Sequence, residues 1–486
     1  MTESSPTHRR NSRLHALDGI LGRDPDDFAA RAERAGLLRE QGRFEDAKAD
    51  YLELIRRKPD DFAALNDFGT LVLSAGYSEA ARSLFGEAVR HHPDNPNGRV
   101  NLANLLFLTG EYAAARAHFE AALKSDPGHI HAHRGFGNLL AALGDNAGAR
   151  AHRDKGFKGY ALTALPYRGD GAPVSVLLLV AAAGGNIPTG ALLDDRQFQT
   201  SVLVADYADD DLALPPHDLV FNSIGDADLC REALQAACSL LSRTARPLIN
   251  HPAQVLKSGR VANASRLHGL PNVVAPRMAV LPKRSLASSA AAVAVAGSGL
   301  AFPLLARAPG FHTGHHFVGA ETPEQLATAV KDFPGDEVCL IERLDARDHN
   351  GMFRKYRAMF VDGALYPLHL AISRDWKVHY FTADMAHSLD NRLKDAAFLA
   401  DMPGTLGPCA MAGLEHIRAA LDLDYGGVDF AVAANGDVLL FEANATMVVY
   451  PPVSDPKWAY RRPAVEAVLG AVRTMLLRRS RADRAA

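Results

Sequence analysis

The sequence of 486 residues contains few of the features that mark secreted, metal-binding or membrane proteins. Its four cysteines, Cys230, Cys238, Cys339 and Cys409, are scattered without CxxC spacing. This argues against a zinc site or a disulfide framework and favours a reducing compartment. No apolar signal-peptide core follows the polar residues 1–13, and no apolar run is long enough to cross a membrane. We therefore expect a cytoplasmic protein.

The sequence also lacks a strong charge of either sign and lacks the phosphate-loop motif GxxxxGK[ST]. A formal net charge of −3 gives no global field that would favour nucleic acid or an anionic membrane, so we expect neither as a partner. The 48% apolar and 22% charged fractions are ordinary for a globular protein. The length predicts two to four domains.

A period of 34 residues organises the first third of the chain, where prolines recur at Pro25, Pro59, Pro93 and Pro127. The columns that keep the same period are Gly42, Gly76, Gly110 and Gly144; Ala47, Ala81, Ala115 and Ala149; and Ala35, Gly69, Ala103 and Gly137. Small residues let two helices approach closely. A proline cannot continue the preceding helix, so it starts the next one. The pattern therefore predicts stacked helix pairs.

This pattern resembles the tetratricopeptide repeat over about residues 25–158. We assign residues 14–158 to an all-α solenoid, in which residues 14–21 form part of a capping helix, and we expect residues 1–13 to be disordered. The resemblance implies a concave groove that holds a peptide or protein partner. The polar residues that we expect in this groove are Arg31, Asn66, Asn101, Asn104, Arg134 and Asn138. For each of them the alternative is a solvated helix face.

Residues 159–172 are rich in glycine and proline and predict a linker, and residues 173–280 predict a small parallel sheet. The apolar run 174–185 is typical of a central parallel strand. Further strands are expected at 200–204, 218–222 and 247–249, with a helix at 227–242. The first strand ends in Gly184-Gly185-Asn186, which either binds an anion through its backbone N–H groups or forms a plain tight turn.

Near the C-terminus, two apolar runs at residues 428–433 and 438–441 flank Asn435-Gly436, which predicts a hairpin. Asp429, Glu442 and Asn444 fall on these paired strands. A carboxylate on an apolar strand needs compensation of its charge. Hard oxygen ligands on rigid strands suit Mg²⁺. The alternative is an edge hairpin with solvated acids.

Basic side chains lie on the strands that precede this hairpin. Arg307 ends the strand 302–307, before a loop that contains Gly310, Gly314 and Gly319 together with His312, His315 and His316. Lys355 and Arg357 share one face of a strand that begins at residue 353 and turns at Asp362-Gly363. A second basic group contains Arg374, Trp376, Lys377 and His379. A polyanion such as ATP explains several cations on strands better than a simple surface does.

The DF…FEAN hairpin, with the basic strands before it, resembles the metal-binding core of ATP-grasp ligases, closest to the glutathione-synthetase and ribosomal-modification glutamate ligase branch. The resemblance implies a multidomain α + α/β protein. The solenoid is followed by a pre-ATP-grasp α/β sheet at residues 173–280 and by a two-lobed α+β ATP-grasp domain at residues 281–477. We expect residues 478–486 to form a disordered basic tail. The departures from the family are an arginine, Arg307, where a lysine is usual, and the histidines in the glycine loop.

The resemblance also implies the cofactors ATP and Mg²⁺ and the roles of individual residues. Asp429, Glu442 and Asn444 would hold Mg²⁺, and Arg357, Lys377 and His379 would act in catalysis. The residues expected to bind the nucleotide are Arg307, Gly310, His312, Gly314, Glu342, Leu344, Asp345 and Lys355. The implied reaction is ATP-dependent ligation of a carboxylate to an amine through an acyl-phosphate. Two alternatives remain: an ATP-grasp kinase for a small molecule, and a nucleotide-sensing interaction protein without catalysis.

Overall fold

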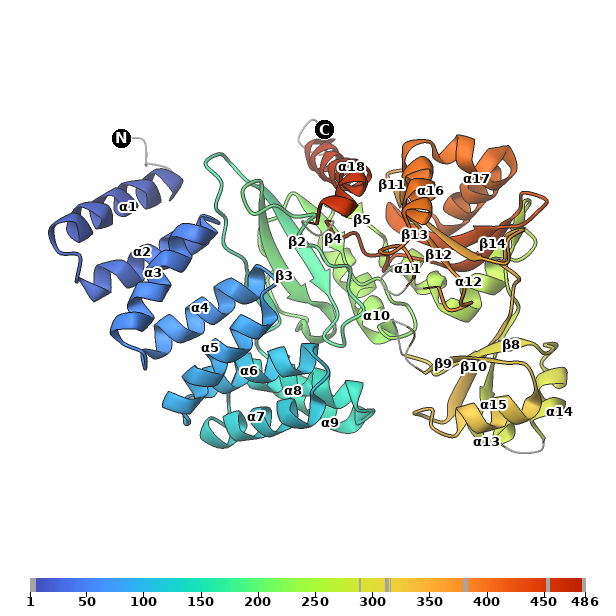
Figure 1. Ribbon diagram of the computed structural model, residues 1–486, viewed down its shortest axis with the longest axis horizontal. Coiled ribbons are helices and arrows are strands. Elements are labelled where there is room, and N and C mark those ends of the chain that lie inside the picture. Colours follow the sequence, from blue (N-terminus) through green and yellow to red (C-terminus); the bar gives the residue numbers. More distant parts are fainter. Residues whose placement is uncertain are drawn as a thin grey trace. The chain divides into compact units, whose positions relative to one another are not determined.

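The computed structural model describes residues 6–287, 290–310, 314, 316–378, 383–451 and 455–482. The chain forms two compact units (Figure 1). The first unit contains Met1–Pro173 together with Asp195–Gln199, and the second contains Val174–Asp194 and Thr200–Ala486. Each unit is described by itself below.

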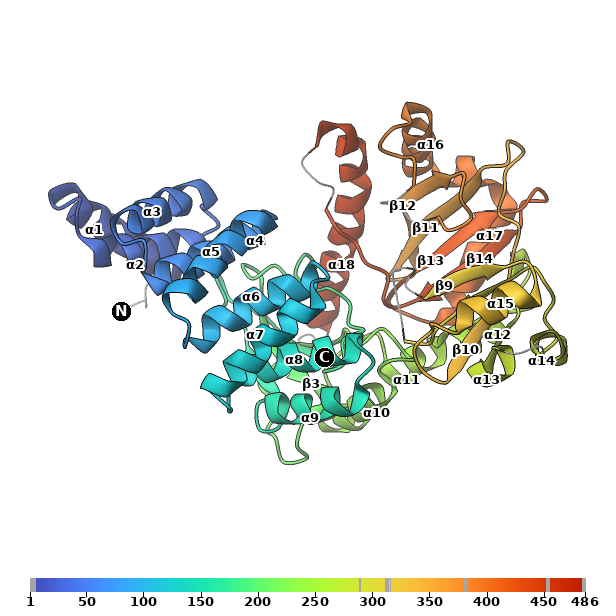
Figure 2. The same cartoon turned by 60° about the horizontal axis from the view of Figure 1, so that its bottom comes forward.

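Helix α1 (Pro6–Arg23) and four helix pairs make up most of the first unit (Figure 2). The pairs are α2 (Phe28–Glu40) with α3 (Phe44–Arg57), α4 (Phe62–Ser74) with α5 (Ser78–His91), α6 (Pro96–Leu108) with α7 (Tyr112–Ser125), and α8 (Ile130–Ala142) with α9 (Asn146–Phe157). The prediction of disorder through residue 13 was wrong for residues 6–13, which are helical because Leu14, Leu17 and Leu21 bury one side of α1.

The repeat columns explain why each helix pair forms. The first helix of every pair begins at a residue whose side chain accepts a hydrogen bond from a backbone N–H; these caps are Asp27, Asp61, Asn95 and His129. The turn inside each pair uses the glycine column at φ between 73° and 88°. At Gly69 a side chain would place its Cβ 2.5 Å from Phe85, so glycine is what allows the two helices of that pair to touch.

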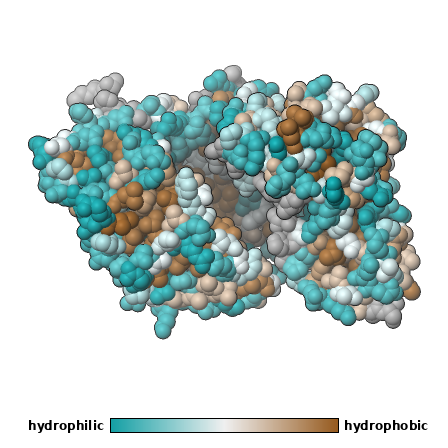
Figure 3. Space-filling view, in the orientation of Figure 1, coloured by the Kyte–Doolittle hydropathy of each residue, from teal (hydrophilic) through white to brown (hydrophobic). Residues whose placement is uncertain are grey.

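Hydrophobic side chains of the first unit are partly exposed. On the face shown in Figure 3, hydrophobic residues gather over helices of this unit. Its exposed large hydrophobic residues include Tyr77, Leu108 and Tyr112. Within the described part of the chain, no helix is long and apolar enough to cross a membrane.

The first sheet has the strand order β1-β3-β2-β4-β5. Its strands are β1 (Leu162–Ala164), β2 (Val174–Val180), β3 (Phe198–Val204), β4 (Leu219–Asn222) and β5 (Leu248–Ile249). β2 pairs in parallel with β4, and β4 with β5. The helix expected at 227–242 begins later, as α10 (Arg231–Leu240), because Asp226 accepts hydrogen bonds from the N–H groups of Asp228 and Leu229 and closes a turn there. Helices α11 (Pro252–Val255) and α12 (Arg260–Leu267) follow β5.

An antiparallel sheet of order β7-β10-β8-β9 comes next. Its strands are β7 (Met278–Pro282), β8 (Leu304–Arg307), β9 (Phe317–Ala320) and β10 (Glu337–Glu342). Helices α13 (Lys283–Leu286), α14 (Ala291–Gly297) and α15 (Pro323–Val330) share one apolar core with it, in which Leu286, Val295 and Leu326 are buried. The single helix expected at 285–297 is therefore two helices, with residues 288–289 outside the described part.

The last sheet has the order β12-β11-β13-β14-β6. Its strands are β6 (Val273–Val274), β11 (Phe353–Val361), β12 (Ala364–Ser373), β13 (Tyr425–Val432) and β14 (Val438–Asn444). Helices α16 (Leu389–Ala400) and α17 (Met402–Leu421) cover one of its faces: Phe398 of α16 packs on Tyr356, and Gly413 of α17 packs close to Val438 (Figure 1).

Two tight turns and a final helix complete this sheet. Asp362 and Gly363 both have positive φ, at 50° and 83°, as a two-residue hairpin requires. At the other predicted hairpin only Gly436 does, because the turn spans Ala433 to Asp437. Helix α18 (Arg462–Ala482) extends past residue 477, so the prediction of a disordered tail was wrong for residues 478–482. Arg479 there forms ion pairs with Asp362 and Asp424.

Candidate functional site

Four neighbouring strands place four titratable side chains in one row. Arg357 of β11 lies opposite His369 of β12 on one side and opposite Asp429 of β13 on the other. Asp429 in turn lies opposite Glu442 of β14. Side chains directly opposite each other on antiparallel strands are close enough to interact. The row, written below as the 369–357–429–442 row, is the centre of the candidate site.

Two β-bulges flank this row, and both change which face a side chain reaches. Phe430 pairs with Leu440 whereas Asp429 pairs with Glu442, so Phe441 is an extra residue in β14. With strict alternation, Glu442 would share a face with Leu440 and Val438, the face that α17 covers. The bulge turns Glu442, and Asn444 after it, to the opposite face. Bulges are frequent next to active sites because they redirect side chains in this way.

Asp429 is held by two cations. Arg357 donates from Nε to Oδ1 at 2.6 Å and from Nη2 to Oδ2 at 2.8 Å, and Lys355 Nζ lies 3.2 Å from Oδ2. Asp429 is only 4% exposed. Burial alone would raise the pKa of Asp429, but the charges of Arg357 and Lys355 outweigh it and hold that pKa well below its ordinary value. Asp429 is therefore ionised at neutral pH.

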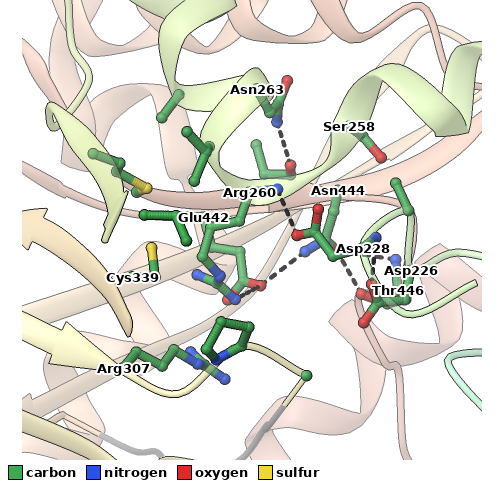
Figure 4. Close-up of a pocket in the computed structure, with 18 of the residues that line it drawn as sticks. Asp226, Asp228, Ser258, Arg260, Asn263, Arg307, Cys339, Glu442, Asn444 and Thr446 are labelled. Carbon is green, nitrogen blue, oxygen red and sulfur yellow. Dashed lines mark hydrogen bonds and ion pairs between the residues drawn. The ribbon is translucent and has the colours of Figure 1, made fainter. Parts of the chain in front are cut away.

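Glu442 is held by a cation from a distant segment. Arg260 Nη2 on α12 donates to Glu442 Oε1 at 2.6 Å, and Asn444 Nδ2 donates to the same oxygen at 2.9 Å (Figure 4). Burial would raise the pKa of Glu442, but the charge of Arg260 lowers it further than burial raises it. Asn444 Oδ1 accepts hydrogen bonds from the backbone and hydroxyl of Thr446.

These groups open into a cavity of about 190 Å³ between α12, the β7-β10-β8-β9 sheet and β14 (Figure 4). Its polar lining includes Arg260, Arg307, Glu442 and Asn444, and its apolar lining includes Met278, Val280 and Leu440. Arg307 is 9% exposed, and burial followed by the charge of Arg260 lowers its pKa. Burial also raises the pKa of the Cys339 thiol, which lines the same cavity, to about 11.

The predicted glycine loop is described in part. Lys377 Nζ donates to the carbonyl oxygens of Gly314, at 2.6 Å, and Phe317, at 3.3 Å. Arg307 lies over the Phe317 ring at 5.6 Å. Lys377 therefore lies against the loop, and Gly310 lines the cavity. His312, His315 and His379 lie outside the described residues.

The acids expected to bind ribose both carry an arginine. Glu342 accepts hydrogen bonds from the side chain and backbone N–H of Arg277. Asp345 accepts two from the side chain of Arg347, and Leu344 lies between the two acids. Among the described residues that line the cavity, none of the three predicted here occurs.

The predicted metal ligands come together but are already engaged. Within the described part of the chain, no cluster of three or more histidine, cysteine, aspartate or glutamate side chains is placed to hold a metal ion. Both oxygens of Asp429 hold cations, and the amide oxygen of Asn444 holds Thr446. Glu442 Oε2 accepts no hydrogen bond from a described residue and belongs to the cavity lining. Carboxylate and amide oxygens fit Mg²⁺, with Glu442 offering the accessible ligand.

Sequence reasoning missed two members of the site. Arg260 was noticed on a basic helix, but its contact with Glu442 joins residues 182 positions apart. His369 lies in the apolar run of β12, where the only available signal was a lone titratable residue in a buried strand. Neither contact follows from spacing along the chain.

The predicted groove residues of the first unit divide into two groups. Arg31 pairs with Asp50 at 3.1 Å, so it serves the interior of a repeat. Arg134 donates to the carbonyl oxygens of Gly156 and Tyr160. Asn101 Nδ2 donates to Asn66 Oδ1 at 2.7 Å, which links neighbouring repeats. Asn104 is half-buried and Asn138 is exposed.

Comparison with known proteins identifies the first unit. The profile of the tetratricopeptide repeat matches residues 14–62, 66–130 and 110–154, so this region carries tetratricopeptide repeats. No curated protein matches the chain.

Solved structures similar to the chain are also repeat proteins. The crystal structure of MamA is 17% identical and aligns over 29% of this chain and 84% of its own, with a TM-score of 0.28. YrrB, described as a TPR protein with an unusual peptide-binding site, is 19% identical over 31% and 77%, with a TM-score of 0.27. A tetratricopeptide repeat protein from Parabacteroides merdae ATCC 43184 is 23% identical over 30% and 58%, with a TM-score of 0.28. Scores this low carry no argument about function.

Proposed function

We propose that the second unit is an ATP-grasp ligase that joins a carboxylate to an amine at the expense of ATP. One observation carries this proposal: the cavity and the row beside it hold more cations than carboxylates. The cations are Arg260, Arg307, Lys355 and Arg357, and the carboxylates are Asp429 and Glu442. Four positive against two negative charges leave an excess of two, in a chain whose formal net charge is −3. A polyanion such as a nucleotide triphosphate would balance that excess.

The arrangement suits phosphoryl transfer, where catalysis is mostly positioning and charge neutralisation. In the proposed reaction a carboxylate oxygen attacks the γ-phosphorus, and the bond to the bridging oxygen of ADP breaks. The amine nitrogen then attacks the acyl carbon and inorganic phosphate leaves. Asp429 fixes the fork of Arg357 in one orientation, and Glu442 does the same for Arg260. Both guanidinium groups are thus set in place before a ligand arrives.

Mg²⁺ fits this site through Glu442, with Asp429 and Asn444 beside it, and would supply charge neutralisation at the phosphate oxygens. Lys377 would reach the phosphates from the glycine loop, which it already contacts through Gly314. His379 and His312 stay predictions. No general base is needed if the amine arrives neutral.

The repeats give the enzyme a second role for its partner. A small-molecule ligase has no use for a solenoid, so we infer that the carboxylate or the amine belongs to a peptide or protein that the repeats hold. The asparagines Asn66, Asn101 and Asn138 are the polar groups that we expect to contact that chain.

A second candidate is a nucleotide-sensing interaction protein without catalysis. The observation that favours it is the engagement of Asp429, whose two oxygens both hold cations. In such a protein the nucleotide would bind, but no phosphoryl group would move.

Calorimetric titration tests both candidates. A non-hydrolysable ATP analogue is titrated with and without Mg²⁺ into the native protein, Glu442→Ala and Glu337→Ala. Glu337 is a matched control, because it lines the same cavity without belonging to β14. We expect Mg²⁺-dependent binding that Glu442→Ala abolishes and Glu337→Ala retains. Absence of binding to the native protein would refute both candidates.

Product analysis then separates the reactions. Release of ADP with formation of an amide supports the ligase. Release of ADP with a phosphorylated product and no amide supports the kinase alternative. Binding without ADP release, even when a peptide partner is present, supports the sensor.

A further inference from the structure

His369 is placed by the same device as Glu442. Ala358 pairs with Pro367 whereas Arg357 pairs with His369, so Leu368 is the extra residue of a β-bulge in β12. With strict alternation, His369 would share a face with Leu365 and Pro367, the face that packs on α16. The bulge turns it toward Arg357 instead. One sheet therefore contains two bulges that bring two titratable side chains into one row.

The surroundings of His369 are cationic. Arg357 and Lys355 face it from β11, Asp429 faces it from β13, and Arg461 faces it from the short helix η4 (Pro456–Arg461) before α18. His369 is buried, and burial followed by the charge of Arg357 holds the pKa of His369 well below its ordinary value. The imidazole is thus neutral at physiological pH. A permanent cation at this position would repel Arg357, and a small side chain would leave space beside it.

We propose that His369 is a positioning residue, which holds the guanidinium of Arg357 against Asp429 from the opposite side of the row. The two neighbours of Arg357 in the row have different effects. Asp429 supplies charge and two hydrogen-bond acceptors. His369 supplies a flat neutral group that limits sideways movement without competing for the fork. This inference rests on the proposed function for its consequence in catalysis, but not for its structural content.

The first test observes Arg357 directly. In protein labelled with ¹⁵N-arginine, the Nε–H signal of Arg357 is assigned by its disappearance in Arg357→Lys. A bidentate ion pair protects this proton from exchange. We expect the signal to broaden or vanish in His369→Ala and to survive in His369→Gln, whose side chain is also neutral and planar. An unchanged signal in His369→Ala would overturn the proposal.

The second test measures turnover. If Arg357 acts on the transferred phosphoryl group, His369→Ala should lower kcat by roughly tenfold or more, because small misplacements of a catalytic group are costly. KM for ATP should change much less, and His369→Gln should restore kcat. In an Arg357→Ala background, His369→Ala should have no further effect on kcat. An equal further loss there would contradict action through Arg357.

The two tests separate two kinds of failure. If the native protein shows no turnover, the proposed function fails, and the Nε–H signal still decides whether His369 positions Arg357. If turnover is present but the signal and kcat are unchanged in His369→Ala, the positioning role fails and the proposed function stands.

Discussion

Asp429→Asn is the substitution for which the structure gives the clearest magnitude. Asparagine keeps the shape of the side chain but removes its charge, so the cations around it lose their nearest carboxylate. Removing one partner of a buried ion pair costs about 3–5 kcal/mol, because the remaining charge is left uncompensated. The side chains of Arg357 and Lys355 are 21% and 17% exposed, so water reaches them in part. We therefore expect a loss at the low end, roughly 3 kcal/mol.

Urea unfolding followed by tryptophan fluorescence measures this loss in the second unit alone. The two tryptophans of the chain, Trp376 and Trp458, both belong to that unit. Asp345→Asn is the matched control, because Asp345 also forms a bidentate pair with an arginine but is 61% exposed, and its partner Arg347 is 56% exposed. Exposed pairs contribute about 0–1 kcal/mol, so this variant should unfold close to the native protein.

The same experiment has a defined pH dependence. The pKa of Asp429 is lower in the folded protein than in the unfolded chain, where it is about 3.9. Its contribution to stability is therefore fully present above that value and is lost as pH falls toward the folded pKa. The gap between native protein and Asp429→Asn should narrow below about pH 4. An equal midpoint for the two proteins at neutral pH, or an equal loss in Asp345→Asn, would refute the reasoning.

Two further predictions concern packing. Gly69→Ala should destabilise the repeats by about 1–3 kcal/mol, because its Cβ would lie 2.5 Å from Phe85. Gly36→Ala, with nothing within 4 Å and a helical backbone, should instead stabilise them by about 0.5–1 kcal/mol. Thermal unfolding by far-UV circular dichroism compares the two, and losses of equal size would contradict the crossing geometry. Cys339, buried and with a pKa raised to about 11, should resist alkylation at neutral pH until urea unfolds the unit. Mass spectrometry of its peptide detects this, and rapid labelling of the folded protein would show that the cavity is open to the reagent.

Local patterns in the sequence were enough to predict the repeats and most strands. The helix pairs could be predicted because one position, such as Gly69 against Phe85, recurs at the same step in every copy. The strands around Asp429 and Arg357 could be predicted from apolar runs interrupted by charge. These signals depend on neighbours a few residues away, or on a period that repeats. They therefore survive without knowledge of the fold.

The details of the site depend on information that spacing does not carry. A β-bulge changes the face of every later residue in a strand, and nothing in the run from Val438 to Glu442 shows that Phe441 is the extra residue. The contact between Arg260 and Glu442 likewise requires the packing of α12 beside β14. The turn at Asn435-Gly436 differs for a smaller reason: Ala433 and Asp437 close it, so only the glycine needs positive φ.

The ion pairs of the site suggest how ligand and metal would depend on each other. Without ligand, Asp429 and Glu442 are satisfied by Arg357 and Arg260, so the carboxylates and the cations neutralise one another. In the proposed function, phosphate oxygens compete for the arginines, and each arginine that turns toward phosphate leaves a buried carboxylate without its partner. Such a carboxylate is costly unless another cation replaces the arginine. Mg²⁺ at Glu442 would be that replacement. Binding of the nucleotide and of the metal should therefore strengthen each other by the same factor, since linkage is reciprocal. This exchange is the physical reason why the titration should show binding only with Mg²⁺ and why Glu442→Ala should abolish it.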